Sequence, residues 1–155
     1  MTIHDSRLRN GTLTLGATTD TVDVSCQITN VRITSSYSDD GDAVTTLCGD
    51  SLPAPRKLDG HHLEGTIIQD FDVAATDGGV IAWLWAHDLT AVTYEYLPDD
   101  AGAPTITGTL LIEIPGDTFG GDTNARTTSD FSWSLQGKPT FAWPAAGNGT
   151  QTEAA

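Results

Sequence analysis

The chain has 155 residues, enough for one domain with a hydrophobic core, and apolar residues make up 38% of it. A formal net charge of −14 argues against wrapping a nucleic acid, because phosphates are neutralised by Lys and Arg. The sequence contains no apolar run of roughly 18 residues, so it predicts no membrane span. Its first residues, MTIHDSRLRNG, contain no apolar stretch typical of a signal peptide. We therefore expect a protein that is made and assembled in a cytoplasm.

The N-terminal part of the chain predicts short strands. Residues 1–11 are polar and lack periodicity, which predicts an N-terminal arm before a strand over residues 12–15. Even positions are apolar over 22–28 and odd positions over 31–33, so we expect one strand with a bulge near Thr29-Asn30.

Residues 35–60 are polar and irregular, apart from a short apolar run near residues 44–47. They predict a large loop or an extended hairpin outside the core. Asp39, Asp40 and Asp42 surround a glycine, but the calcium-loop pattern is incomplete, so we expect an exposed acidic turn.

The cysteines and histidines predict no metal site. Cys26 and Cys48 lie in apolar segments that could pair as a hairpin, and we expect small buried hydrophobes without a disulfide or a zinc ion. His61 and His62 are neighbours near the start of a predicted strand over 62–71. Their side chains therefore point to opposite faces and cannot chelate one ion together.

The centre of the chain predicts the helix. Asp77 is a good N-cap for a helix of about three turns over residues 77–89. Val80, Ile81 and Leu84 share one face of it. The strand before the helix also has one apolar face, which consists of Leu63, Ile67 and Phe71.

Two strands over residues 92–97 and 105–114 predict a late hairpin with a turn at 98–104. Residues 115–127 predict a loop. The wet faces of the two strands carry threonines and acids, namely Thr93, Glu95, Thr105, Thr107, Thr109 and Glu113.

The last strand shows strict alternation in DFSWSLQ. Gly-Lys-Pro at 137–139 breaks the pattern, and Phe141 and Trp143 follow before a C-terminal tail over 144–155. We expect these two aromatics to leave the core and to anchor the tail, on a neighbouring subunit or on the same one. The side chains expected to face the core are Phe131, Trp133 and Leu135.

Together these segments predict a mainly β protein of six to eight strands with one α-helix. One helix cannot cover two sheet faces, so we expect a two-sheet β-sandwich or partial barrel over residues 12–143, with the helix on one flank. No internal repeat is visible.

The sequence carries no strong catalytic motif. A nucleophile elbow, a phosphate-binding loop and a dinucleotide fingerprint are all absent from it. Asp70 and Asp72 share a strand face, and glycosidases use paired acids in aromatic clefts, but these acids lie on wet positions. We expect no enzyme, and no cofactor or metal. The aromatic candidates for such a cleft are Trp83, Trp85, Trp133 and Trp143.

Five segments carry a resemblance to a known family: RNGTLTLG, SCQITNVRITSSYSDDGDAVTTLCGD, GTIIQDFD, VIAWLWAHDL and TSDFSWSLQGKPTF. Their order resembles that of the tail tube proteins of long, non-contractile-tailed bacteriophages, especially phages that infect high-GC Gram-positive bacteria. The resemblance runs over about residues 8–143. It implies two packed sheets with a flanking helix, and hexameric rings that stack into a hollow tube in the virion tail.

The resemblance also implies partners and surfaces. Genomic DNA would pass through the tube without specific binding, and the partners would be tape-measure, distal tail and tail terminator proteins, with no membrane. Residues 35–60 would form an inter-ring loop. Acids in the lumen would repel DNA, and we expect the lumen to be lined by Glu64, Thr66, Glu95, Thr107 and Glu113. Anchors between subunits or for the arms are expected among Tyr37, Asp39, Asp40, Leu52, Arg56, Phe141 and Trp143.

Two alternatives stay open. One is a monomeric carbohydrate- or protein-binding β-sandwich module that uses exposed tryptophans as a platform. The other is a single-ring tail terminator or head–tail connector, which shares the tube fold but does not stack.

Overall fold

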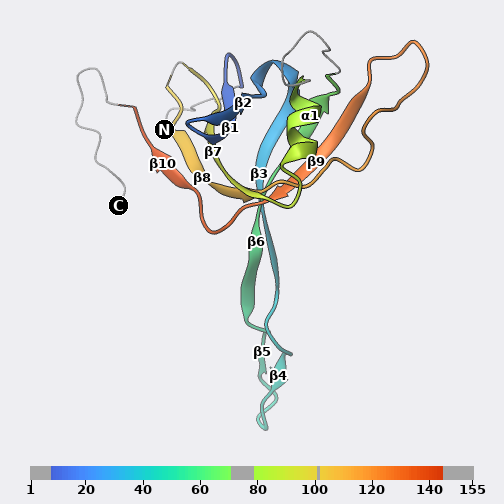
Figure 1. Ribbon diagram of the computed structural model, residues 1–155. Helices are drawn as coiled ribbons and strands as arrows, with labels where there is room; N and C mark the ends of the chain where they lie inside the picture. Colours follow the sequence, from blue (N-terminus) through green and yellow to red (C-terminus); the bar gives the residue numbers. More distant parts are fainter. Residues whose placement is uncertain (1–7, 71–78, 101, 145–155) are drawn as a thin grey trace.

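The computed structural model describes residues 8–70, 79–100 and 102–144 of the chain (Figure 1). The elements of these residues are β1 (Thr12–Ala17), β2 (Asp20–Asp23), η1 (Ser25–Gln27), β3 (Ile28–Asp39), β4 (Val44–Thr45), β5 (Ser51–Leu52), β6 (Arg56–Ile68), α1 (Gly79–Ala86), β7 (Ala91–Leu97), β8 (Thr105–Leu111), β9 (Thr128–Ser134) and β10 (Thr140–Ala142). The prediction of a mainly β protein with one helix is confirmed. The strands outnumber the predicted six to eight because several have only two to four residues.

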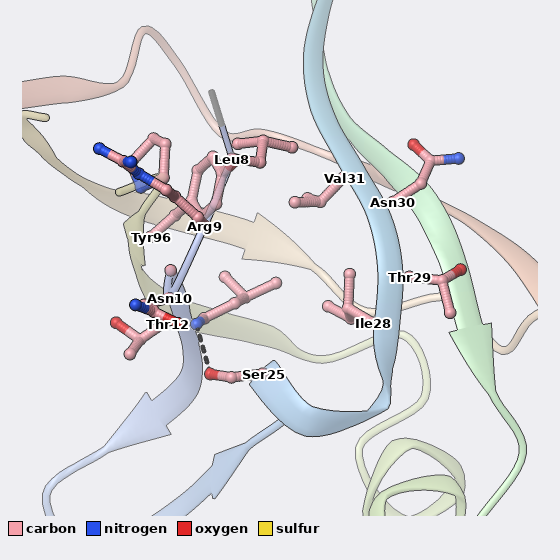
Figure 2. Close-up of a pocket in the computed structure, with 13 residues that line it drawn as sticks. Leu8, Arg9, Asn10, Thr12, Ser25, Ile28, Thr29, Asn30, Val31 and Tyr96 are labelled. Atoms are coloured by element: carbon pink, nitrogen blue, oxygen red, sulfur yellow. Dashed lines mark hydrogen bonds between the residues drawn. The ribbon is translucent and has the colours of Figure 1, made fainter. Parts of the chain in front are cut away.

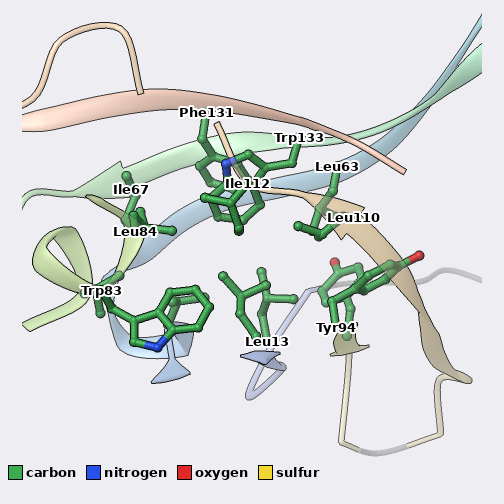
Figure 3. Close-up of a cluster of buried hydrophobic side chains, with 14 of the residues drawn as sticks. Leu13, Leu63, Ile67, Trp83, Leu84, Tyr94, Leu110, Ile112, Phe131 and Trp133 are labelled. Atoms are coloured by element: carbon green, nitrogen blue, oxygen red, sulfur yellow. The ribbon is translucent and has the colours of Figure 1, made fainter. Parts of the chain in front are cut away.

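Two antiparallel sheets make up the body. One has the strand order β10-β8-β7-β1-β2, and the other has the order β3-β6-β9. Neither closes into a barrel, which is consistent with the predicted two-sheet β-sandwich with one helix. Figure 3 shows apolar side chains of both sheets meeting in one layer, with Trp83 and Leu84 of α1 at one end.

The last long strand contributes to this layer as its alternation predicts. Phe131, Trp133 and Leu135 are buried, and Trp133 has no exposed surface. The Phe131 and Trp133 rings stack with their centroids 4.2 Å apart. The Trp133 Nε1–H donates to the carbonyl oxygen of Glu113 at 3.0 Å, so the buried indole leaves no polar atom unpaired.

The helix is shorter at its C-terminal end than the predicted 77–89. Its buried residues are Val80, Ile81, Trp83 and Leu84, which include the predicted face. After Ala86 the chain turns, and Leu89 adopts a left-handed conformation with φ 57°. The Leu89 N–H then donates to the Ile112 carbonyl at 2.8 Å, which directs the chain into β7. Phe71, Asp72 and Asp77 lie outside the described residues.

The predicted single strand over 22–28 is wrong, because η1 interrupts it. The bulge near Thr29-Asn30 is confirmed by a register shift between Ile28 and Asn30 in the pairing of β3 with β6. Cys26 lies in η1 and is exposed, so the prediction of a buried side chain is wrong there. A 3₁₀ turn has no period-2 alternation, so the even-position pattern stops before it.

Residues 35–60 form an extended hairpin, one of the two predicted alternatives. β3 and β6 run on past the body as two long paired strands, and β4 and β5 pair at the far tip (Figure 1). We call residues 35–60 the hairpin arm. Cys48 lies at its tip and is exposed, so neither cysteine is buried and the two are not hairpin neighbours.

Gly65 allows β6 to pass close to the bulge of β3. A Cβ there would lie 2.0 Å from the Asn30 carbonyl oxygen and 3.0 Å from Phe131 Cζ. We expect Gly65→Ala to lower the free energy of unfolding by roughly 1–3 kcal/mol, because backbone and core must shift to admit the methyl group. Gly116→Ala is the control, since no atom lies within 4 Å of its Cβ position. Urea unfolding midpoints that agree for the two variants would contradict this account.

Candidate assembly surfaces

The outward face of the five-stranded sheet consists mainly of threonines. Its strands contain no Lys or Arg. Buried residues such as Leu13, Tyr94 and Ile106 alternate with the outward ones, so strand alternation defines this face. We call it the threonine face, and it comprises Thr12, Thr14, Thr21, Asp23, Thr93, Glu95, Thr105, Thr107, Thr109, Thr140 and Ala142, with half-buried Leu97 and Leu111 beside them.

One row of the threonine face crosses the whole sheet. The strand registers place Asp23 opposite Thr14, Thr14 opposite Glu95, and Glu95 opposite Thr107. Thr140 of β10 completes the row beside Thr107. Two of the five predicted lumen residues, Glu95 and Thr107, are therefore direct cross-strand neighbours.

The outward face of the three-stranded sheet carries an arginine as well as acids, namely Arg32, Glu64 and Asp130. We call it the mixed-charge face. Arg32 Nε lies 3.6 Å from Glu64 Oε2, so the charge of this glutamate is partly offset. The Thr66 hydroxyl donates to Asp130 Oδ1 at 2.8 Å, and Asn30 Nδ2 donates to the Thr66 hydroxyl at 3.4 Å.

The structure distributes the five predicted lumen residues over three places. Glu95 and Thr107 lie on the threonine face, and Glu64 and Thr66 lie on the mixed-charge face. Because the two sheets pack face to face, these outward faces point in opposite directions. Glu113 lies beyond the end of β8, where its side chain is exposed and its carbonyl accepts the Trp133 bond. Alternation identified wet positions, but it does not say which sheet a strand joins.

The five anchors predicted between residues 37 and 56 all lie on the hairpin arm, with Leu52 paired to Val44 at its tip. Arg56 Nη1 lies 2.8 Å from Asp39 Oδ1, and the Asp40 N–H donates to the Pro55 carbonyl at 2.7 Å. Tyr37 faces Leu58 across the hairpin, and both are exposed. Sequence reasoning missed most of the exposed apolar side chains of the arm, although the apolar run at 44–47 was a signal. The exposed apolar side chains of the arm are Tyr37 and Leu52, which were predicted as anchors, and Val44, Leu47 and Leu58, which were not.

The two predicted C-terminal anchors are Phe141, in edge strand β10 of the five-stranded sheet, and Trp143, just beyond it. β10 pairs with β8, and Phe141 stands opposite Ile106. Phe141 and Trp143 are 49% and 59% exposed. The other exposed tryptophan, Trp85, is on α1 at the opposite flank of the body, 5.8 Å from Phe119 between ring centroids (Figure 1). The exposed tryptophans of the described residues therefore do not form one platform.

A polar cluster ties the other edge of this sheet to the helix. Asp20, the first residue of edge strand β2, accepts from Trp83 Nε1 at 2.9 Å through one carboxylate oxygen. Its other oxygen lies 2.7 Å from His87 Nε2. The His87 ring stacks on Trp83 with centroids 3.9 Å apart, and its Nδ1 lies 2.8 Å from the Trp83 carbonyl oxygen. We call these three residues the β2 clamp.

The clamp geometry fits a charged histidine. Both ring nitrogens of His87 face acceptors, a carbonyl and a carboxylate, and only the imidazolium form can donate to both. Burial lowers the pKa of His87, but the bonds to Trp83 and Asp20 outweigh it and raise this pKa above 6.5. The hydrogen bonds from Trp83 and His87 lower the pKa of Asp20 below 3.8. The clamp therefore favours the ion pair of the Asp20 carboxylate with the His87 imidazolium.

A cavity of about 300 Å³ opens where the N-terminal segment passes β3 (Figure 2). Leu8, Ile28 and Val31 line the gap, and the Leu13 N–H donates to Ser25 Oγ at 2.8 Å in its wall. No His, Cys, Asp or Glu belongs to the lining. Its lining combines apolar side chains with polar ones, among them Arg9, Ser25 and Asn30.

The described part of the chain holds no group of three or more His, Cys, Asp or Glu side chains arranged to bind a metal ion. Within residues 8–70, 79–100 and 102–144, no helix is long and apolar enough to cross a membrane.

Comparisons with known proteins identify no family for this chain. No protein-family model matches the chain, and no curated protein matches it. Among solved structures, a chain described as "Virion of native gene transfer agent (GTA) particle" is similar at 17% sequence identity, over 84% of this chain and 95% of that chain, with a TM-score of 0.45. A likeness at this score carries no argument for a shared fold or function.

The β2 clamp predicts the sign of a pH dependence. Because the folded pKa of His87 is raised, its stabilising contribution is full below 6.5 and is lost as pH rises through the folded pKa. We expect Asp20→Asn to flatten this loss of stability, measured as urea unfolding midpoints between about pH 6 and pH 9. Asp122→Asn, which removes a charge from the 115–127 loop, should keep the wild-type slope. A variant Asp20→Asn with an unchanged slope would contradict the clamp.

Proposed function

We propose that this protein is the structural subunit of a phage tail tube, in which six copies form a ring and rings stack into a hollow tube. The observation that carries the proposal is an open five-stranded sheet whose outward face has threonines and acids but no basic residue. This agrees with what the resemblance implies. The partners would then be tape-measure, distal tail and tail terminator proteins, and the protein would be located in the virion tail.

The threonine face is the better candidate for the lumen. DNA passing a wall is held back by Lys and Arg, and this face has none, while Glu95 and Asp23 add repulsion. The mixed-charge face offers Arg32 to a phosphate, and its Glu64 is already paired. We therefore assign Glu95 and Thr107 to the lumen, and Glu64 and Thr66 to the outside of the tube.

Ring closure would use the two edges of the five-stranded sheet. An open sheet presents unpaired N–H and C=O groups at each edge, which pair readily with another chain. When one edge meets a different edge of an identical copy, the contact is heterologous, and it closes into a ring if the rotation closes. Asp20, Thr21 and Asp23 of edge strand β2 are exposed residues, and the Asp20 carboxylate is held by the β2 clamp.

Stacking would use the hairpin arm. It projects well past the body and carries exposed apolar side chains at its tip, Val44, Leu47 and Leu52. Apolar side chains on a projecting hairpin gain free energy when another subunit covers them. We propose that each arm contacts the next ring, and that Phe141 and Trp143 contact a neighbouring subunit.

The binding-module alternative fares less well. It requires clustered exposed tryptophans, and Trp85 and Trp143 lie on opposite flanks. The cavity of Figure 2 is lined by residues of other types. A monomer at every salt concentration whose tryptophan fluorescence responds to a sugar would nevertheless favour it.

The proposal is tested by negative-stain electron microscopy of the concentrated protein over a range of salt. Salt matters because repulsion between like charges is screened over about 10 Å at 0.1 M. We expect hollow tubes or stacked rings from the wild type. In the matched variant, Asn-Gly replaces residues 41–54, which closes the hairpin just beyond the Asp39–Arg56 pair.

The shortened variant should fold, because no residue of the buried core lies in 41–54. We expect single rings from it, since the apolar tip is gone. Single rings from the wild type as well would favour a terminator or connector. Tubes from the shortened variant would contradict the stacking role of the arm.

Lumen assignment is tested by two charge reversals. We expect Glu95→Lys tubes assembled with DNA to protect it from nuclease, because a lysine ring binds phosphates, and to lose that protection as salt rises. Glu64→Lys tubes should protect no more DNA than the wild type. Protection by Glu64→Lys alone would place the lumen on the mixed-charge face.

A further inference from the structure

We propose that β10 is a temporary cover of the β8 edge, which β2 of a neighbouring copy displaces when the ring closes. The proposal rests on the ring proposed above, and it names the strand edges that form the junction. The occupant of the uncovered edge is a second copy of this chain.

β10 is weakly held. It has three residues, all of them exposed, and Pro139 and Pro144 flank it. Its ladder covers only Thr105–Thr107 of the seven-residue β8. A strand bounded by prolines cannot extend its pairing in either direction without losing donors.

Release of β10 leaves the core closed. The preceding segment is anchored separately, because Leu135 is buried and the Gln136 N–H donates to the Thr109 carbonyl at 2.8 Å. Gly137 follows with φ 88°, in the left-handed region that favours glycine. The chain therefore has a natural pivot between the anchored segment and β10.

Strand polarity selects β8 over β10 as the joining edge. Every neighbouring pair in the five-stranded sheet is antiparallel, so its two edge strands, β10 and β2, run in the same direction. Rotation about a tube axis leaves the direction of a strand along that axis unchanged. A junction of β10 with β2 of the next copy would therefore be parallel, whereas a junction of β8 with β2 is antiparallel.

The antiparallel junction is the favoured one. Parallel pairing is slightly less stable per residue, and sheets of one kind throughout are over-represented. The incoming β2 would also run in the same direction as the β10 that it replaces, and so could use the same backbone groups of β8.

The side chains of β2 match those of β10. In β10, Thr140 and Ala142 lie on the threonine face and Phe141 lies on the inner side. In β2, Thr21 and Asp23 lie on the threonine face and half-buried Val22 lies on the inner side. The exchange therefore keeps a polar outward face and an apolar inward side chain at the junction.

The first test locks β10 in place. Thr105→Cys and Ala142→Cys stand opposite each other across β8 and β10, where Cα atoms about 4.5–5.5 Å apart suit a disulfide. The background carries Cys26→Ser and Cys48→Ser, because both native thiols are exposed. We expect the oxidised protein to assemble at least about tenfold less than the same protein reduced.

The control is a disulfide between Thr93→Cys and Thr109→Cys, which joins β7 to β8 on the same face. It should assemble equally in both redox states, because these strands stay paired. Equal assembly of the oxidised and reduced β8–β10 lock, with tubes formed, would overturn the edge-cover proposal and leave the tube proposal standing.

The second test needs no cross-link. Ala142→Pro removes an N–H from β10, and Ala142→Val favours the strand, at an exposed site outside the core. We expect Ala142→Pro to assemble at a concentration about tenfold lower than Ala142→Val, the equivalent of roughly 1.4 kcal/mol. Equal concentrations would overturn the proposal.

Failure of the tube proposal is recognised separately, as a wild type that forms no ring at any salt. In that case the self-association of the two Ala142 variants, measured by light scattering, tests whether β10 covers the β8 edge. Stronger self-association of Ala142→Pro than of Ala142→Val supports it, and equal behaviour overturns it.

Discussion

A fully buried indole links the two sheets. Trp133 of β9 is fully enclosed, and its Nε1–H bonds to the backbone just beyond β8 of the opposite sheet. Loss of a large buried aromatic costs about 3–5 kcal/mol, which is a large share of the stability of a domain this size. Both sheets bury their apolar side chains on the inner faces, so the outer faces are mainly polar. The proposed contacts with DNA and with other subunits depend on these outer faces.

The sequence predicted the elements well where alternation is long. Phe131, Trp133 and Leu135 are all buried, as their spacing requires. Alternation fails at Cys26, because a 3₁₀ turn follows a different period. It also cannot detect β10, whose three residues are too few to show a period.

The surfaces were harder to predict than the core. Glu64 and Glu95 both occupy wet strand positions, yet they belong to different sheets facing opposite ways. Which strands pair depends on contacts between segments far apart in the chain, and local sequence does not encode those contacts. The β2 clamp was missed for the same reason, because 67 residues separate Asp20 from His87.

The continuity of β3 and β6 has a mechanical consequence. Both strands run from the arm into the body without a linker, so a force applied at the tip reaches the core through covalent backbone on both sides of the hairpin. The ladder is interrupted between Ser36 and Tyr37, close to where the arm leaves the body. Bulges bend a ribbon and increase its twist locally. We therefore expect the arm to transmit force as a paired ribbon that is bent at this register shift, up to the end of the ladder at Asp39 and Arg56.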